Sequence, residues 1–447
     1  MMKEIRLPWQ KIGAVRPRSV GEIGHSPFTL GCEVLDRGFA DYDEYCGEIV
    51  PLGIPTIRLQ GGWARTEQIP GRYDFAWLDH IIDDALSRGL NILLETDYGN
   101  PAYPGGGGAD LAGSFPCSPV ALAAWDRWVA AMAHRYAGKV RDWAMWNEPD
   151  YGGKKSVGEI VDFNIRTARI IRGIIPDARI AGLSLASSDD RFVQYVALLA
   201  ERGELENFTW LIYHGYTPNP DCATDTGERL RTFITDYSDT VRLRQGENGC
   251  PSERTELFSL NGIDWSEFSQ SKWDLRRFIG DVAHGVETSI FTICDFYHVG
   301  REVNRKGLLY AGPDHKVVRR KQSYYAIQHM TSIFDDRLRP VPADRAAVTF
   351  PRRCAVYPFS DTTGRGNLLA FWDRSDVPGE KEETENVRIM LRDLPLSCPV
   401  LVEMISGSVY RIPEEQITEG SGFTLFRDMP IIDSPLLLAD RSLLCLK

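Results

Sequence analysis

The sequence lacks any long apolar run. No stretch approaches the roughly eighteen uninterrupted apolar residues that a membrane-spanning helix needs, so we expect no transmembrane anchor. The first segment, MMKEIRLPWQKIGAVRPRSV, carries charges throughout and does not contain the apolar core of a secretory signal. We therefore expect a cytoplasmic location, with prior removal of a leader as the alternative.

Basic residues are in deficit. The chain of 447 residues has 51 Lys and Arg against 62 Asp and Glu, which gives a formal net charge of −11 and a sequence pI of about 5.4. A surface of that sign repels phosphate backbones and anionic lipids. We therefore expect neither nucleic acid nor a membrane as a partner.

Motifs that bind metals, dinucleotides or phosphates are also missing. The nine cysteines form an odd set without any Cys-x-x-Cys pair, which argues against a zinc site and against a complete disulfide framework. We expect mostly reduced, buried thiols. No Gly-x-Gly-x-x-Gly motif opens a helix after the first predicted strand, and the glycines at 105–108 lack the lysine of a P-loop. The sequence thus predicts no metal and no organic cofactor.

Between residues 28 and 335 the chain alternates between strand-like apolar runs and amphipathic helical stretches. The predicted strands are 28–34, 56–59, 91–96, 140–146, 178–183, 209–214, 241–245 and 289–295. Eight strand and helix units in roughly 300 residues indicate an α/β protein with a closed (β/α)₈ TIM barrel rather than an open doubly wound sheet.

The pattern changes after residue 335. Short apolar runs such as AVYPF, NLLAFWD and NVRIML are separated by Pro, Gly, Asp and Ser, almost without helical periodicity. We expect residues 1–335 to form the catalytic barrel, with a short N-terminal extension. Residues 336–447 are expected to form a C-terminal antiparallel β-sandwich-like domain.

Polar side chains follow the predicted strands at their carboxyl ends, which form the active face of such a barrel. In chain order they are Arg58, Asp97, Tyr98, Asn147, Glu148, His214, Tyr216, Glu247, Asp295 and Tyr297. Glu148 follows the fourth strand and Glu247 the seventh. A carboxylate in such a place is either hydrogen-bonded for structural reasons or kept for chemistry. Asp97 and Asp295 are equally compatible with loop caps and with acceptors of hydroxyl hydrogen bonds.

Two opposed carboxyl groups about 5 to 5.5 Å apart can divide the work of cleaving a glycosidic bond. One must be protonated to donate to the leaving oxygen, and the other must be ionised to attack the anomeric carbon. Burial and a negative neighbour raise the pKa of the first, whereas hydrogen bonds and a cation keep the second charged.

Four segments resemble the clan A glycoside hydrolases, which carry an acid/base glutamate in an Asn-Glu-Pro motif after strand four and a nucleophilic glutamate after strand seven. WNEPD at 146–150 is similar to the first motif, and QGENG at 245–249 is similar to the second, though less so in its neighbours. IRLQGGWAR at 57–65 and DYGNPAY at 97–103 look like segments of the β-xylosidase and α-L-iduronidase branch, family 39. The resemblance covers about 28–335.

This resemblance implies a retaining glycoside hydrolase that works through a covalent glycosyl-enzyme intermediate. Glu148 is then the acid/base and Glu247 the nucleophile. Asn147 is expected to hydrogen-bond the sugar 2-hydroxyl, and Arg58 to hold the nucleophile ionised. The implied partner is an oligosaccharide or glycoside substrate.

The remaining candidates concern the walls of the sugar site. By the same resemblance Tyr216 lies close to the nucleophile and His214 near the sugar hydroxyls, although His214 can equally be a satisfied core histidine. Aromatic rings near strand ends can stack on the apolar face of a pyranose. The candidates for this role are Trp63, Tyr98, Trp146, Phe296 and Tyr297.

Two other functions stay open. The chain could be a non-catalytic carbohydrate-binding protein on a degenerate barrel, in which the carboxylates only accept hydroxyl hydrogen bonds. It could also be a transglycosylase, which shares the covalent intermediate. The sequence does not indicate the sugar, its anomeric configuration, exo or endo action, or the oligomeric state.

Overall fold

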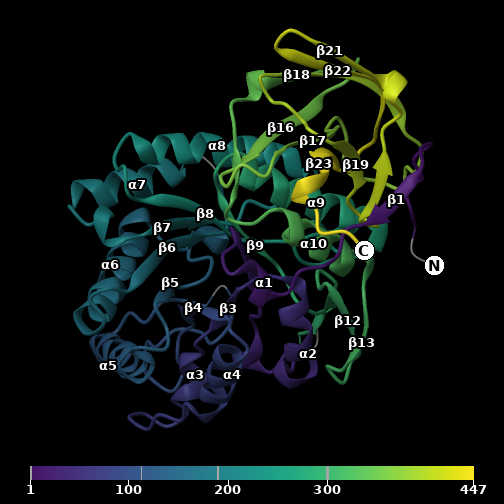
Figure 1. Cartoon of the computed structure of the whole chain (residues 1–447). Coiled ribbons are helices and arrows are strands. Elements are labelled where there is room, and N and C mark those ends of the chain that lie inside the picture. The colour runs from purple at the N-terminus through teal and green to yellow at the C-terminus, as the bar shows by residue number, and fades with distance from the viewer. Residues whose placement is uncertain (1–2, 112, 189–190, 299–301) are drawn as a thin grey trace.

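Eight parallel strands close into a barrel in which β9 pairs back onto β2. The computed structural model describes residues 3–111, 113–188, 191–298 and 302–447. The barrel strands are β2 (Phe28–Gly31), β3 (Thr56–Gln60), β4 (Asn91–Thr96), β5 (Asp142–Met145), β6 (Arg179–Leu185), β7 (Trp210–Tyr213), β8 (Arg242–Asn248) and β9 (Glu287–Ile290). The predicted (β/α)₈ barrel is confirmed, and each predicted strand overlaps one of these (Figure 1).

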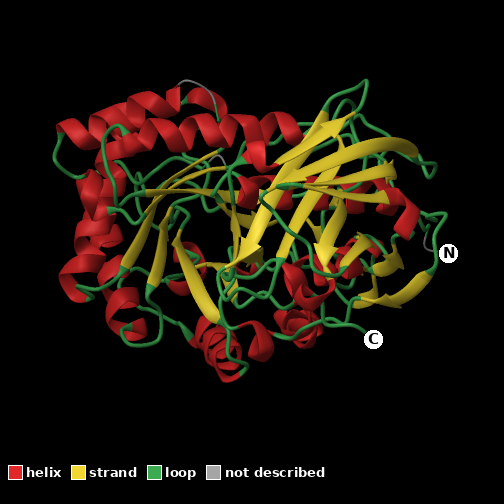
Figure 2. Cartoon of the chain, turned by 45° about the horizontal axis from the view of Figure 1, so that its top comes forward, coloured by secondary structure: helices red, strands yellow, loops and turns green. Residues whose placement is uncertain are grey.

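Helices cover the outside of the barrel (Figure 2). They are α1 (Val20–Ile23), α2 (Tyr42–Ile49), α3 (Trp63–Thr66), α4 (Ala76–Ser87), α5 (Pro119–Tyr136), α6 (Val157–Ile174), α7 (Arg191–Glu201), α8 (Pro220–Thr235), α9 (Glu267–Ala283) and α10 (Gln322–Ile333). The start of α5 follows from its sequence, because the Ser118 side chain accepts a hydrogen bond from the Ala121 amide and Pro119 occupies the first turn.

Alternation along the strands separates an apolar shell from a partly polar interior. In β3, Ile57 and Leu59 pack in the main apolar core, whereas Arg58 faces the opposite way, beside Leu93 of β4. A second apolar cluster fills part of the barrel interior. Its members are Leu93, Ala144, Ala181, Trp210 and Ile212. Arg58 therefore enters the barrel interior as a charged group beside a packed apolar layer.

The chain after α10 forms antiparallel sheets, as predicted. A seven-stranded sheet has the order β1-β20-β19-β23-β17-β16-β14, and a four-stranded sheet has the order β15-β18-β22-β21. The strands are β14 (Leu338–Pro340), β15 (Ala346–Thr349), β16 (Cys354–Asp361), β17 (Asn367–Asp373), β18 (Glu385–Arg392), β19 (Pro399–Glu403), β20 (Ser408–Arg411), β21 (Ile417–Gly420), β22 (Phe423–Ile431) and β23 (Leu436–Asp440).

One strand of the seven-stranded sheet comes from the start of the chain. β1 (Lys11–Ala14) pairs antiparallel with β20, so the purple N-terminal segment lies beside yellow C-terminal strands in Figure 1. Two short hairpins, β10 (Phe296–Tyr297) with β11 (Val303–Asn304) and β12 (Leu309–Ala311) with β13 (Val317–Arg320), lie between the barrel and α10. The division of the chain at residues 335 and 336 stays a prediction.

Two barrel strands end several residues earlier than predicted. β2 stops at Gly31, so Glu33 lies beyond the strand and not within it. β9 begins and ends earlier than the predicted strand, so Asp295 and Tyr297 do not stand at its carboxyl end. The first difference adds a residue to the active face, and the second removes two.

The strand ends that carry the two glutamates are irregular. β8 shifts register between Gln245 and Asn248, a bulge that includes Glu247. Trp146 and Glu148, just past β5, have φ values of 60° and 48°, in the left-handed region that residues with a side chain rarely adopt. Strained backbone of this kind concentrates at functional sites, where the surrounding structure holds it in place.

Among the described residues no helix is both long and apolar enough to cross a membrane. All nine cysteines are free, as expected. Only Cys32, Cys250 and Cys294 are buried, so the expectation of mostly buried thiols was wrong for the other six.

Candidate active site

A cavity of about 510 Å³ opens at the carboxyl ends of the barrel strands. Its polar lining consists of Glu33, Arg37, Gln60, Tyr98, Asn147, Glu148, Tyr151, Tyr216, Glu247, Ser259, Asn261, His298, Asn304 and Lys306. Both glutamates that the sequence singled out therefore line one cavity.

Arg58 lies beneath the cavity and hydrogen-bonds to several of the residues that line it. Its side chain is 1% exposed and reaches three carboxylates. It donates to Glu33 at 2.8 Å, to Glu247 at 2.9 Å and to Glu95 at 2.8 and 3.0 Å. A planar guanidinium can serve several acceptors at once, which an ammonium group cannot do in the same geometry.

Glu247 is held in its ionised form. Arg58 donates to one carboxylate oxygen, and the Tyr216 hydroxyl donates to the other at 3.1 Å. Burial alone would raise the pKa of Glu247, but the charges on His214 and Arg58 and these hydrogen bonds bring it below its ordinary value. An ionised, hydrogen-bonded carboxylate is what a nucleophile at this position requires.

The pKa of Glu148 is shifted in the opposite direction, upward. Burial raises its pKa, and the negative charge of Glu247 raises it further, while the contact with His214 works in the other direction. The His214 Nδ1 lies 2.8 Å from a Glu148 carboxylate oxygen. Ligand atoms of Glu148, His214 and Glu247 all lie within 4.8 Å of one another, so the two carboxyl groups face each other closely.

The same three side chains are close enough together to bind a metal ion. Each already has partners, because His214 and Glu148 bond to each other while Arg58 and Tyr216 occupy Glu247. A metal would have to displace these contacts. The arrangement suits proton transfer and nucleophilic attack without such displacement.

A hydrogen-bond chain leaves donors facing the cavity. Arg58 donates to the Asn147 amide oxygen at 2.6 Å, which fixes the amide nitrogen as the donor to the Tyr98 hydroxyl at 2.9 Å. Gln60 also donates to that hydroxyl at 3.3 Å, and its own amide oxygen accepts from Arg37 and from the Val34 amide.

The Tyr98 oxygen thus accepts two hydrogen bonds. Among the residues that the structure describes, none accepts its phenolic proton, and Asn147 retains one N–H without a protein acceptor. Tyr98 and Asn147 both line the cavity, so these two donors are available to a ligand there.

Glu33 and Lys306 are site residues that the sequence analysis missed. Burial raises the pKa of Glu33 to about 7, against the opposing charge of Arg58. Lys306 is 2% exposed and has no carboxylate within ion-pairing distance among the described residues. Its ammonium group lies 5.6 Å from the ring centre of Tyr216, and burial lowers its pKa to about 8. The signal for Glu33 was present, since it follows the first barrel strand. No comparable pattern marks Lys306.

Two predicted aromatic contacts lie outside the cavity. Trp63 is fully buried, stacks on Tyr103 with 5.6 Å between ring centres, and donates its indole N–H to Glu67. Trp146 packs edge-on against Phe115 at 4.7 Å. Both rings belong to the apolar core, so the structure does not place them for stacking on a sugar.

Three further candidates do not reach the cavity. Asp97 is fully buried, and neither of its carboxylate oxygens has a described partner. Asp295 is buried between Lys321, at 2.6 Å, and Arg305, at 3.0 Å, and so forms a structural ion pair. Tyr297 donates to the Ala311 carbonyl at 3.3 Å.

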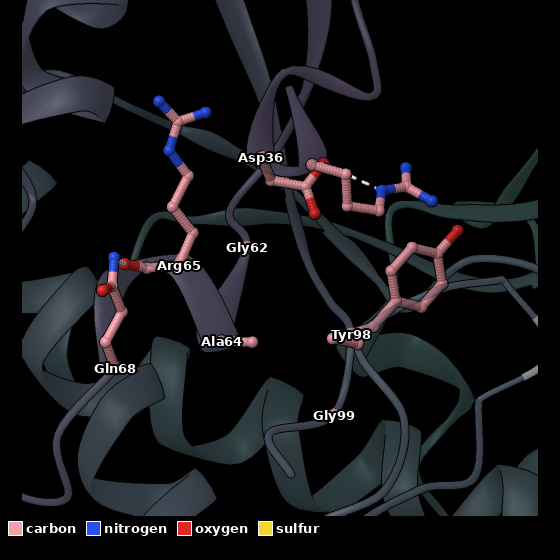
Figure 3. Close-up of a pocket in the computed structure, with 9 residues that line it drawn as sticks. Asp36, Gly62, Ala64, Arg65, Gln68, Tyr98 and Gly99 are labelled. Carbon is pink, nitrogen blue, oxygen red and sulfur yellow. Dashed lines mark hydrogen bonds and ion pairs between the residues drawn. The ribbon is translucent and has the colours of Figure 1, made fainter. Parts of the chain in front are cut away.

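A second, smaller cavity of about 310 Å³ adjoins the first, because Tyr98 and Arg37 line both. Figure 3 shows Tyr98 on one side of it and Arg65 and Gln68 on the other. Arg37 contacts Asp36 at 3.2 Å and Asp110 at 2.6 Å. The charges that line this cavity are largely paired, and we assign it no part in the chemistry.

Parts of this chain are similar in sequence to known proteins. The model of glycoside hydrolase family 42, described as β-galactosidase, matches residues 48–106. A nonribosomal peptide synthetase of Omphalotus olearius is 30% identical over 116 residues, which span 26% of this chain and 2% of that protein. Each match concerns a minor part of the chain.

Solved structures match over nearly the whole length. A family 39 glycoside hydrolase from the gut symbiont Bacteroides cellulosilyticus has a TM-score of 0.69 at 15% identity, covering 93% of this chain and 81% of that one. A monomeric β-xylosidase from Caulobacter crescentus has a TM-score of 0.58 at 16% identity, covering 96% and 97%. A family 30 endoxylanase from Clostridium papyrosolvens has a TM-score of 0.57 at 13% identity, covering 96% and 98%. The chain therefore shares its fold, a (β/α)₈ barrel followed by antiparallel sheets, with these glycoside hydrolases of families 39 and 30.

Proposed function

We propose that the chain is a retaining O-glycoside hydrolase that acts by double displacement. The observation that carries this proposal is that the pKa values of two facing carboxyl groups are shifted in opposite directions. His214, Arg58 and Tyr216 lower the pKa of Glu247, whereas burial and the charge of Glu247 raise the pKa of Glu148. Their close approach agrees with the short separation that retaining enzymes use.

In the first step a Glu247 oxygen attacks the anomeric carbon. The bond from that carbon to the leaving oxygen breaks, and Glu148 transfers its proton to this oxygen, so the leaving group departs as a neutral alcohol. Tyr98 and Asn147 supply the free donors that we assign to substrate hydroxyls. A bond from the Asn147 amide that strengthens as positive charge develops on the sugar stabilises the transition state.

In the second step water hydrolyses the glycosyl enzyme. Esterification removes the negative charge of Glu247, which is one of the causes that raise the pKa of Glu148. Glu148, now a carboxylate with a lowered proton affinity, takes a proton from water as the water oxygen attacks the anomeric carbon. Glu247 leaves as a carboxylate, and the sugar is released with its original configuration.

Replacement of Glu247 tests this mechanism. Glu247→Ala should lower kcat for an activated aryl glycoside by on the order of 10⁴-fold, because the covalent step is lost. Azide or formate should partly restore turnover and give a glycosyl adduct of inverted configuration. Glu253→Ala is the matched control, since Glu253 is an exposed glutamate in the loop that follows β8. Near-normal turnover by Glu247→Ala would exclude the proposed nucleophile.

A panel of aryl glycosides combined with a binding assay separates this function from the alternatives. Saturable binding of a sugar without turnover of any glycoside would favour a carbohydrate-binding protein. Products longer than the substrate would indicate transglycosylation through the same intermediate.

A further inference from the structure

The floor and the mouth of the active-site cavity differ in character. The floor is polar and buried, with Arg58, Asn147 and Glu33 almost inaccessible to solvent. The mouth carries three large apolar or aromatic side chains that are exposed. They are Leu111 at 37%, Tyr151 at 52% and Leu257 at 44% exposure, and we call them the apolar rim.

This clustering is not what scattered surface residues produce. Nine large hydrophobic side chains are exposed among the described residues, and three of them lie on the 20 residues that line this one cavity. Single exposed hydrophobic residues are ordinary on protein surfaces, whereas a group of them around a cavity marks a contact site. The rim residues come from three separate loops, after β4, β5 and β8.

One rim residue lies close to the proposed proton donor. Tyr151 opens the short 3₁₀ turn Tyr151–Gly153, and its amide donates to the carbonyl of Glu148 at 3.1 Å. Because both residues line the same cavity, Tyr151 lies on the side of the cavity from which Glu148 would protonate a leaving group. Phe258, next to Leu257, extends the apolar surface inward, where it stacks on His298 with 5.2 Å between ring centres.

A second sugar would find fewer partners at the rim than an apolar group would. Sugar hydroxyls require polar partners, which leucine side chains do not offer, and Tyr151 is the one rim side chain that could stack on a pyranose. Ser259 and Asn261 also line the cavity, and the Asn261 amide nitrogen donates one of its two N–H groups to the Phe258 carbonyl at 2.8 Å. An aryl or alkyl group, by contrast, is removed from water by contact with all three rim side chains.

We propose that the apolar rim is an aglycone subsite that selects glycosides with an aryl or alkyl leaving group over those with a second sugar. This inference rests on the proposed glycosidase function, because it names the leaving group of that reaction. The sugar occupies the polar floor beside Glu247, and the aglycone extends outward between Tyr151 and Leu257.

The test uses methyl, butyl and octyl glycosides of the sugar that the aryl glycoside panel identifies, below micelle-forming concentrations, beside the disaccharide of that sugar. In the wild-type protein kcat/KM should rise along the series by a factor of up to about four per buried methylene, and the octyl glycoside should exceed the methyl glycoside by at least about 20-fold. It should also exceed the disaccharide.

The variant Leu111→Ser with Leu257→Ser should reduce the octyl advantage by at least about fivefold and leave the methyl glycoside within about twofold of wild type. Val318→Ser, which alters an exposed residue on β13 away from the cavity, is the matched control and should change neither value. Equal rates for octyl and methyl glycosides, a preference for the disaccharide, or an octyl advantage that survives the double substitution would overturn the inference.

Failure of the proposed glycosidase function can be distinguished from failure of the aglycone subsite. If no glycoside is turned over, the glycosidase function fails, and calorimetric titration with octyl and methyl β-D-glucoside decides the subsite alone. Tighter binding of the octyl compound that the double substitution abolishes supports an apolar subsite in a binding protein. Equal affinities or no binding would refute it.

Discussion

Replacement of Arg58 by lysine provides the sharpest test of how the site is held together. The guanidinium donates to Glu33, Glu95, Glu247 and Asn147 through bonds of 2.6 to 3.0 Å. An ammonium group keeps the positive charge but has only three N–H donors. At least two of the five short hydrogen bonds are lost, and each bond to a charged group is worth about 1.5 to 3 kcal/mol.

We therefore expect Arg58→Lys to lower the free energy of unfolding by about 3 to 6 kcal/mol at pH 7, measured by urea denaturation. The loss should depend on pH with a definite sign. The folded-state pKa of Glu247 is lowered, so its contribution to stability is present above the unfolded pKa and is lost as pH falls through the folded one. The difference between variant and wild type should thus shrink in acid.

Arg141→Lys is the matched control, because Arg141 is exposed and lies 3.6 Å from an exposed Asp177. Its effect should stay within about 0.5 kcal/mol. Arg58→Lys should also move the acid limb of the kcat/KM profile to higher pH, since Glu247 loses a hydrogen bond to its ionised form. A variant that unfolds within about 1 kcal/mol of wild type, with an unchanged acid limb, would refute the assigned role of Arg58.

Three further substitutions test separate features. Because His214 lowers the pKa of both Glu148 and Glu247, His214→Asn should move both limbs of the pH profile for kcat/KM upward, and unchanged limbs would contradict this coupling. Burial lowers the pKa of Lys306 to about 8, so its charge destabilises the fold below that pH, and Lys306→Met should raise the free energy of unfolding by up to about 3 kcal/mol at pH 7. That gain should decline as pH rises from about 8 towards the ordinary lysine pKa of 10.5, and urea denaturation at several pH values checks it. Asp295→Asn should cost about 3 to 5 kcal/mol in the same assay with kcat/KM unchanged at low temperature, whereas a large loss of kcat/KM would return Asp295 to the site.

The barrel could be predicted because its strands are buried on both faces and are separated by capped helices. Those features are local in the sequence, and all eight predicted strands are found in the barrel. Strand ends were less predictable. The run from Phe28 to Val34 was read as one strand, although Gly31 within it is a residue type that weakens a strand interior, and the strand ends there. Glu33 was therefore read as part of a strand and not as part of the site.

The aromatic residues show a different limit. A tryptophan directly after a strand can face the cavity or turn away from it, and its neighbours in the sequence do not decide between these. Trp63 follows Gly62, whose φ of 59° turns the chain into α3, and the ring then packs against Trp125 and Trp128. Those partners lie on α5, far away in the sequence. Lys306 was missed for the same reason, because its place beside Tyr216 depends on tertiary folding.

The proposed roles of the two glutamates depend on residues outside either motif. Both carboxyl groups are buried, and burial alone would raise the pKa of each. Arg58 removes the symmetry, since it bonds to Glu247, and among the described residues its hydrogen bonds do not include Glu148. Arg58 itself is fixed by Glu95 on β4 and by Glu33 after β2, which accepts from the same guanidinium nitrogen as Glu247. Exchanging the roles would therefore require moving a buried arginine away from three carboxylates, a far larger cost than exchanging one proton. In the proposed mechanism the first three barrel strands thus decide which glutamate attacks, although the two glutamates themselves stand just after the fourth strand and on the seventh.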